Sequence, residues 1–241
     1  MNALFDLIAF DADDTLWHNE RLFLLGRQRL EEILAPYQIT ENIQEHLEAI
    51  EVANLKYYGY GVMSFILSSI EAAVSLTAGR MASNDVKAVL DLGKSMLSAN
   101  VELFEGVEDM LVNVQPFSPL MLITKGEPNH QYSKLERSGI RSYFQFIEVV
   151  HDKSQDVYAE ILARVKVAPD RFLMIGNSIR SDILPVLALG GWAVHLPNNL
   201  TWSHEIIDLS EIPQGKFFKL SNIKLLPELL NQLTQKEFRK R

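Results

Sequence analysis

Two kinds of hydrophobic pattern alternate along the chain. Before residue 19 and after residue 99, apolar runs of four or five residues are separated by stretches with apolar residues at helical spacing. This alternation predicts a parallel sheet with helices on both faces, because βαβ crossovers place helices there. The runs are Leu7–Phe10, Leu120–Ile123, Phe146–Val150, Phe172–Ile175, Trp192–Leu196 and Phe217–Leu220. The helical stretches are Val107–Val114, His130–Ser138, Gln155–Val165, Arg180–Ala188 and Leu225–Thr234.

The segment between the first two runs, Asn19–Ala99, has a helical pattern and contains no β-rich run. Pro36 is expected to end a first helix, because proline cannot continue the backbone hydrogen bonding of a helix. Thr40 is expected to cap a second helix. Two further helices are predicted at Met63–Thr77 and Asp85–Leu97. Helices in this arrangement form a small antiparallel bundle.

The predicted fold is therefore α/β, a doubly wound, Rossmann-like parallel sheet with an all-helical domain inserted after the first strand. We place the α/β core domain at residues 1–18 and 100–241 and the helical domain at residues 19–99. The chain of 241 residues is long enough for such a core and a modest second domain.

Composition and charge then exclude several classes of function. With 31 acidic and 23 basic side chains, the net charge of −8 repels a phosphate backbone, so nucleic acid is not an expected partner. The absence of Cys excludes a disulfide framework, a thiolate metal site and a Cys nucleophile. No apolar run approaches the roughly 18–20 residues of a membrane span, and Asp6 interrupts the only apolar stretch near the start. A cytoplasmic protein that binds no membrane is expected.

Polar side chains that can carry chemistry follow four of the predicted strands. Ligands of an open parallel sheet bind outside the carboxyl ends of its strands, so these side chains are expected to converge on one site. They are Asp11 and Asp13 after the first strand, Thr124 and Lys125 after the second, Lys153 after the third, and Asn177 and Asp182 after the fourth.

The types of these residues indicate phosphoryl chemistry. Asp11 and Asp13 repel each other unless one carries a proton or a cation lies between them. Carboxylate and amide oxygens suit a hard dication, Mg²⁺ above all. A metal ion, a lysine and free backbone N–H groups together form a seat for a phosphoryl group. A carboxylate can then attack phosphorus and form an aspartyl-phosphate.

Here the sequence resembles a known family. The segment Leu7–Leu16, Leu-Ile-Ala-Phe-Asp-Ala-Asp-Asp-Thr-Leu, is similar to the first motif of the haloacid dehalogenase superfamily. The similarity continues in order through Thr124 in Leu-Ile-Thr-Lys-Gly, Lys153, and Gly176–Ser178 with Asp182. It covers about residues 6–191, and the helical segment lies where that family has its helical cap.

The resemblance implies a role for each residue. Asp11 is the nucleophile, and Asp13 is the general acid and then the general base, with its carbonyl on the metal. Thr124 and the N–H of Lys125 hold the phosphoryl oxygens, while Lys153 neutralises their charge. Mg²⁺ is bound by Asp11, Asp13, Asn177 and Asp182. Family members that displace halide lack an acid at the position of Asp13, so the resemblance implies a magnesium-dependent phosphatase of a small phosphomonoester.

One departure from the family pattern leaves alternatives open. The family often has Asp after the glycine of its fourth motif, where this chain has Asn177. Either Asn177 or Asp182 then coordinates the metal directly. A second alternative is a catalytically impaired member that binds a metabolite or a partner, and mutases and phosphonate hydrolases also share this core. The sequence indicates neither the substrate nor the oligomeric state.

Other residues near the motifs have two readings. His18, Asn19 and Glu20 follow the first motif and are candidates to face the substrate. Tyr57–Gly61 separates two predicted helices, where a loop could reach the site or simply pack on the surface. His195, in a predicted strand, is expected to be a packing residue.

Overall fold

The computed structural model describes residues 4–198, 200 and 215–240. Its strands form one sheet in which every neighbouring pair is parallel, in the order β3-β2-β1-β4-β5-β6. The predicted α/β fold class is confirmed. The strands are β1 Leu7–Phe10, β2 Leu120–Lys125, β3 Phe146–Val150, β4 Phe172–Gly176, β5 Trp192–His195 and β6 Phe217–Lys219.

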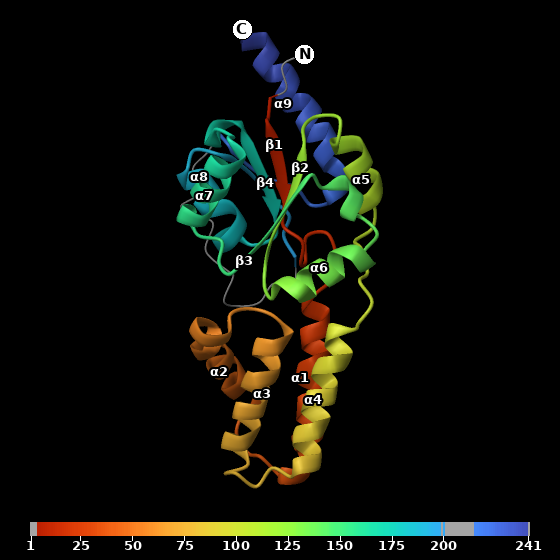
Figure 1. Ribbon diagram of the computed structural model, residues 1–241, viewed down its shortest axis with the longest axis vertical. Helices are drawn as coiled ribbons and strands as arrows, with labels where there is room; N and C mark the ends of the chain where they lie inside the picture. The colour runs from red at the N-terminus through yellow and green to blue at the C-terminus, as the bar shows by residue number, and fades with distance from the viewer. Residues whose placement is uncertain (1–3, 199, 201–214, 241) are drawn as a thin grey trace.

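Five helices cover the sheet, and they lie on both of its faces (Figure 1). Alternate residues of β1 show why: Ile8 and Phe10 belong to one hydrophobic cluster, with α5, α6 and α9. Leu7 and Ala9 belong to another, with α7 and α8. Side chains of a strand point alternately to opposite faces, so an apolar run without polar interruptions is buried on both. The helices are α5 Val107–Val114, α6 Pro128–Arg137, α7 Gln155–Val165, α8 Leu184–Ala188 and α9 Leu226–Lys240.

Four further helices follow β1 and form what we call the helical bundle, residues 20–97. Figure 1 shows it beyond the carboxyl ends of the strands, joined to the rest of the chain by the segments before α1 and after α4. The bundle has a hydrophobic cluster of its own, which includes Leu30, Leu47, Phe65 and Val89. Its helices are α1 Glu20–Leu34, α2 Ile43–Tyr58, α3 Val62–Leu76 and α4 Ser83–Leu97.

Local details differ from the sequence predictions in two places. The cap of α2 is Asn42, whose side chain accepts hydrogen bonds from the N–H groups of Gln44 and Glu45, so the prediction of Thr40 was wrong. The helix predicted at Arg180–Ala188 begins as a π-turn, Ile179–Ile183, before α8. Within the described residues, none of the helices combines the length and hydropathy that crossing a bilayer requires.

Candidate active site

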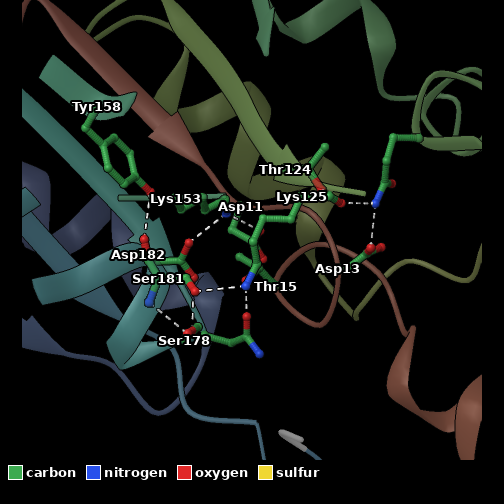
Figure 2. Close-up of polar contacts among 12 residues, drawn as sticks. Asp11, Asp13, Thr15, Thr124, Lys125, Lys153, Tyr158, Ser178, Ser181 and Asp182 are labelled. Atoms are coloured by element: carbon green, nitrogen blue, oxygen red, sulfur yellow. Dashed lines mark hydrogen bonds and ion pairs between the residues drawn. The ribbon is translucent and has the colours of Figure 1, made fainter. Parts of the chain in front are cut away.

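A buried row of three charges lies at the carboxyl ends of β1 and β4. Lys153 donates to Asp11 Oδ1 at 2.5 Å and to Asp182 Oδ1 at 2.7 Å. Figure 2 shows the ammonium between the two carboxylates. Asp11 is 6% exposed, Lys153 2% and Asp182 1%. One ammonium therefore balances two carboxylates in a place that solvent hardly reaches. The structure thus brings together three residues that the sequence assigned to different strand ends.

Short-range contacts hold both carboxylates in place. Asp11 Oδ2 accepts from the Thr15 hydroxyl at 2.8 Å, and the same hydroxyl lies 3.3 Å from Asn177 Oδ1. Asp182 Oδ2 accepts from the N–H of Ser178 at 3.0 Å. Each carboxylate therefore uses one oxygen for Lys153 and the other for its own loop, which fixes its orientation.

The ionisation of this cluster reflects its burial. Burial raises the pKa of Asp11 to about 7, against the opposing effect of the nearby ammonium, and the carboxylate of Asp182 pushes it in the same direction as burial. Burial by itself lowers the pKa of Lys153, but its two carboxylate partners outweigh that effect and raise it. The cluster consequently has an excess of negative charge that a bound cation would offset.

Asp13 lies in a second cluster that the sequence did not reveal. Its carboxylate accepts hydrogen bonds from the Trp17 indole at 2.5 Å, Lys134 at 2.5 Å and Gln131 at 2.8 Å. Burial pushes the pKa of Asp13 upward, but Lys134 and these hydrogen bonds outweigh it, so the pKa lies below its usual range. Gln131 and Lys134 are three positions apart on α6, a spacing that places two side chains on one helix face.

Thr124 and Lys125 end β2 on the other side of the nucleophile candidate. Thr124 is buried, and its hydroxyl lies 3.4 Å from the carbonyl of Lys125. Lys125 donates to the Ser181 hydroxyl at 2.9 Å, and its ammonium lies 3.9 Å from the centre of the ring of Tyr60, in the loop between α2 and α3. The chain then turns at Gly126, whose φ of +128° favours glycine.

A cavity of about 160 Å³ joins these groups. All seven residues predicted for the site line it, and so do residues of the helical bundle. From the segment after the first motif, Asn19 and Glu20 line the cavity, whereas His18 packs against Phe104 with ring centroids 4.0 Å apart. Of the loop Tyr57–Gly61, Tyr60 and the two glycines line it, and both other tyrosines are exposed. His195 is buried and makes a hydrogen bond to the carbonyl of Asn177, next to the cavity rather than in it.

The donor atoms fit a hard dication. Within the described residues, no group of three or more His, Cys, Asp or Glu side chains is arranged to hold a metal. The available set is instead two carboxylates, of Asp11 and Asp182, with the amide oxygen of Asn177 and backbone carbonyls. Asp11 Oδ2 and Asn177 Oδ1 both face the Thr15 hydroxyl, which places them near one another. An oxygen-only set beside an excess of negative charge is the chemistry that Mg²⁺ prefers.

The chain is similar to known proteins over most of its length. The family model of haloacid dehalogenase-like hydrolases matches residues 5–190. A haloacid dehalogenase-like family hydrolase from Xanthomonas campestris is 34% identical, with a TM-score of 0.87 over 99% of this chain and 96% of that one. A 2-haloacid dehalogenase from Pseudomonas syringae is 21% identical, with a TM-score of 0.65 over 95% and 99%. A HAD-hydrolase from Bacillus subtilis bound to magnesium is 19% identical, with a TM-score of 0.68 over 94% and 99%. No curated protein matches the chain.

Proposed function

Because the chain belongs to the haloacid dehalogenase-like hydrolases, we propose that this hydrolase is a magnesium-dependent phosphatase of a small phosphomonoester. The observation that carries the proposal is the position of two carboxylates in one cavity. Asp11 is clamped by Lys153 and Thr15, and Asp13, two residues later, lines the same space with its own set of donors.

In the first step, an oxygen of Asp11 attacks phosphorus and the bond to the leaving oxygen breaks. Asp13, which its contacts with Lys134, Gln131 and Trp17 favour as a carboxylate, must bind a proton together with the substrate. It then gives that proton to the leaving oxygen, so an alcohol departs and an aspartyl-phosphate remains. Thr124 and the N–H of Lys125 hold the phosphoryl oxygens. Lys153, already paired with Asp11, stays beside the charge as it passes to the phosphoryl group.

In the second step, water attacks the aspartyl-phosphate, and Asp13 as a carboxylate takes its proton. Free Asp11 and inorganic phosphate result. The contacts of Asp13 with Lys134, Gln131 and Trp17 favour the carboxylate form that this step uses.

We assign the metal to Asp11, the carbonyl of Asp13 and Asn177, with Asp182 acting through Lys153 or a bridging water. Asn177 is half-buried, and its amide oxygen and Asp11 Oδ2 both lie near the Thr15 hydroxyl, whereas Asp182 is only 1% exposed. When bound, Mg²⁺ would polarise the phosphoryl oxygens and offset their charge. The Bacillus subtilis protein of similar fold is described as bound to magnesium, which supports the choice of metal in this proposal.

The helical bundle acts in this proposal as a cap over the cavity. Bundle residues line the same cavity as Asp11, so the bundle can exclude water and select the leaving group. A dehalogenase fits the site less well, because halide leaves without a proton and gives Asp13 no task in the first step. The catalytically impaired alternative depends on Asn177 alone.

Hydrolysis of p-nitrophenyl phosphate tests the proposal. We expect release that requires Mg²⁺, stops with EDTA and is abolished in Asp11→Asn. Asp109→Asn, the same change at an exposed position of α5, is the matched control and keeps the wild-type rate. A set of small phosphomonoesters covers the case in which the aryl group does not enter the cavity. Wild-type rates in Asp11→Asn would refute the mechanism, and Mg²⁺ binding without turnover of any ester would favour the impaired alternative.

A further inference from the structure

A second group of charges lines the cavity from the helical bundle. Arg27 on α1 donates to Glu20 Oε1 and to Glu51 Oε2, each at 3.0 Å. The side chains of Arg27, Glu20 and Glu51 are 11%, 14% and 10% exposed. We call these residues the acidic triad. All three line the cavity.

The triad has one positive and two negative charges. The Arg27 guanidinium donates to both carboxylates and lies 5.8 Å from the centre of the Phe65 ring, so its charge is already paired within the protein. Glu20 Oε2 and Glu51 Oε1 accept no hydrogen bond from the residues that the structure describes. Burial raises the pKa of Glu20 to about 7 and also raises the pKa of Glu51, as expected where one cation serves two buried carboxylates.

Apolar side chains line the cavity together with the triad: Phe23, Leu55 and Phe65. A ligand that reaches the triad can therefore contact hydrocarbon as well as carboxylate oxygens. An alkyl chain that ends in a cation matches both features.

Building on the proposed function, we propose that the triad selects a phosphomonoester whose leaving group carries an ammonium group, and that it rejects leaving groups with a carboxylate. An ammonium can donate to the open oxygens of Glu20 and Glu51 and balance the surplus charge. A carboxylate would have to displace one glutamate from Arg27, leaving that glutamate buried without a partner. The free energy of such an unpaired charge opposes binding.

Three esters of nearly equal size isolate the charge of the leaving group: 2-aminoethyl phosphate, 2-hydroxyethyl phosphate and phosphoglycolate. We would measure kcat/KM for each with Mg²⁺, beside p-nitrophenyl phosphate as a neutral reference. In the wild type, we expect kcat/KM for 2-aminoethyl phosphate to exceed that for phosphoglycolate by about 100-fold, with the value for 2-hydroxyethyl phosphate between them. The wild-type protein alone is enough to test this ranking of the three esters.

Two isosteric variants then assign the selectivity to the triad. Glu51→Gln and Glu20→Gln each remove one negative charge, and each is expected to lower the ratio of amine to carboxylate by about tenfold or more. Glu45→Gln, the same change at an exposed position of α2, is the matched control and keeps the wild-type ratio. Urea unfolding confirms that each variant is folded, and either variant suffices if the other is not.

The outcomes separate this inference from the proposed function. Equal rates for the three esters, a preference for the hydroxyl or carboxylate ester, or an unchanged ratio in folded variants would overturn the ammonium selectivity and leave the phosphatase intact. The same holds if Asp11-dependent hydrolysis of p-nitrophenyl phosphate occurs while none of the three esters reacts. If no ester at all is hydrolysed, the proposed function fails, and the inference fails with it.

Discussion

Gly176 ends β4 directly against Asp182, and replacing it with alanine tests how tightly the charged row is built. A Cβ at this position would lie 2.2 Å from Asp182 Oδ2, 2.3 Å from Cγ and 2.6 Å from Cβ. Turning the carboxyl group relieves only the first two contacts, because the Cβ of Asp182 moves with its backbone. The π-turn that carries Asp182 must therefore shift away from β4.

Such a shift breaks two contacts of Asp182, the 2.7 Å ion pair with Lys153 and the 3.0 Å hydrogen bond from the N–H of Ser178. Breaking a buried ion pair costs about 3–5 kcal/mol, because the Asp182 carboxylate would be left buried without a cation, while Lys153 would keep only Asp11. With a urea m-value of about 3 kcal/mol/M, the midpoint of unfolding of Gly176→Ala falls by about 1–2 M. The proposed phosphatase activity is expected to fall as well, since Lys153 loses one of the carboxylates that hold it.

Urea unfolding followed by tryptophan fluorescence, to which the buried Trp17 contributes, measures this effect. The control is a double-mutant cycle with Asp182→Gly, which removes the three atoms nearest to the new Cβ. In that background, Gly176→Ala is expected to cost less than about 1 kcal/mol, because the backbone of Gly176 suits alanine. An unchanged midpoint in the single variant, or an equal cost with and without Asp182, would refute the reasoning.

Three further predictions concern Asn177, Glu20 and Tyr60, which all line the cavity. Asn177→Asp adds a carboxylate to the proposed metal ligands and is expected to lower the Mg²⁺ concentration for half-maximal activity by about tenfold in a metal titration; no change would argue against Asn177 as a ligand. Because the pKa of Glu20 is about 7 in the folded protein and lower when unfolded, this group makes stability fall as the pH rises from about 4.5 to 7. Glu20→Gln is therefore expected to gain about 2 kcal/mol relative to the wild type between pH 5 and pH 8 in urea unfolding, and a constant difference would contradict this pKa. Tyr60→Leu removes the ring above Lys125 and is expected to raise KM about 3- to 10-fold with kcat nearly unchanged; an effect on kcat alone would exclude a role in binding.

The fold could be predicted from the pattern of apolar residues, because that pattern is set within each strand or helix. Apolar runs such as Leu7–Phe10 can be buried on both faces only inside a parallel sheet covered by helices, and the run lengths place each strand. The helical bundle followed from the same periodicity. Local competition decided the details: Asn42 caps α2 in place of Thr40 because its side chain reaches the first free N–H groups of the helix.

The chemically active residues at the strand ends could be named for a related reason. Parallel strands end at one edge of the sheet, so Asp11, Lys153 and Asp182 were expected close together although up to 171 positions separate them. The direct link from Lys153 to both carboxylates was not predictable, since it depends on the π-turn that carries Asp182 and on the bare backbone of Gly176.

The sequence by itself determined the strands of the sheet, the polar residues that follow them and the family. Only the tertiary structure decided which side chains these polar residues contact. Lys134 reaches Asp13 across 121 positions, and Glu51 reaches Arg27 from another helix. A polar residue on a helix has the same local pattern whether it faces water or a cavity. The distinction is made by the packing of α6 against the sheet edge and of α1 against α2, because packing decides which charges lose their solvent.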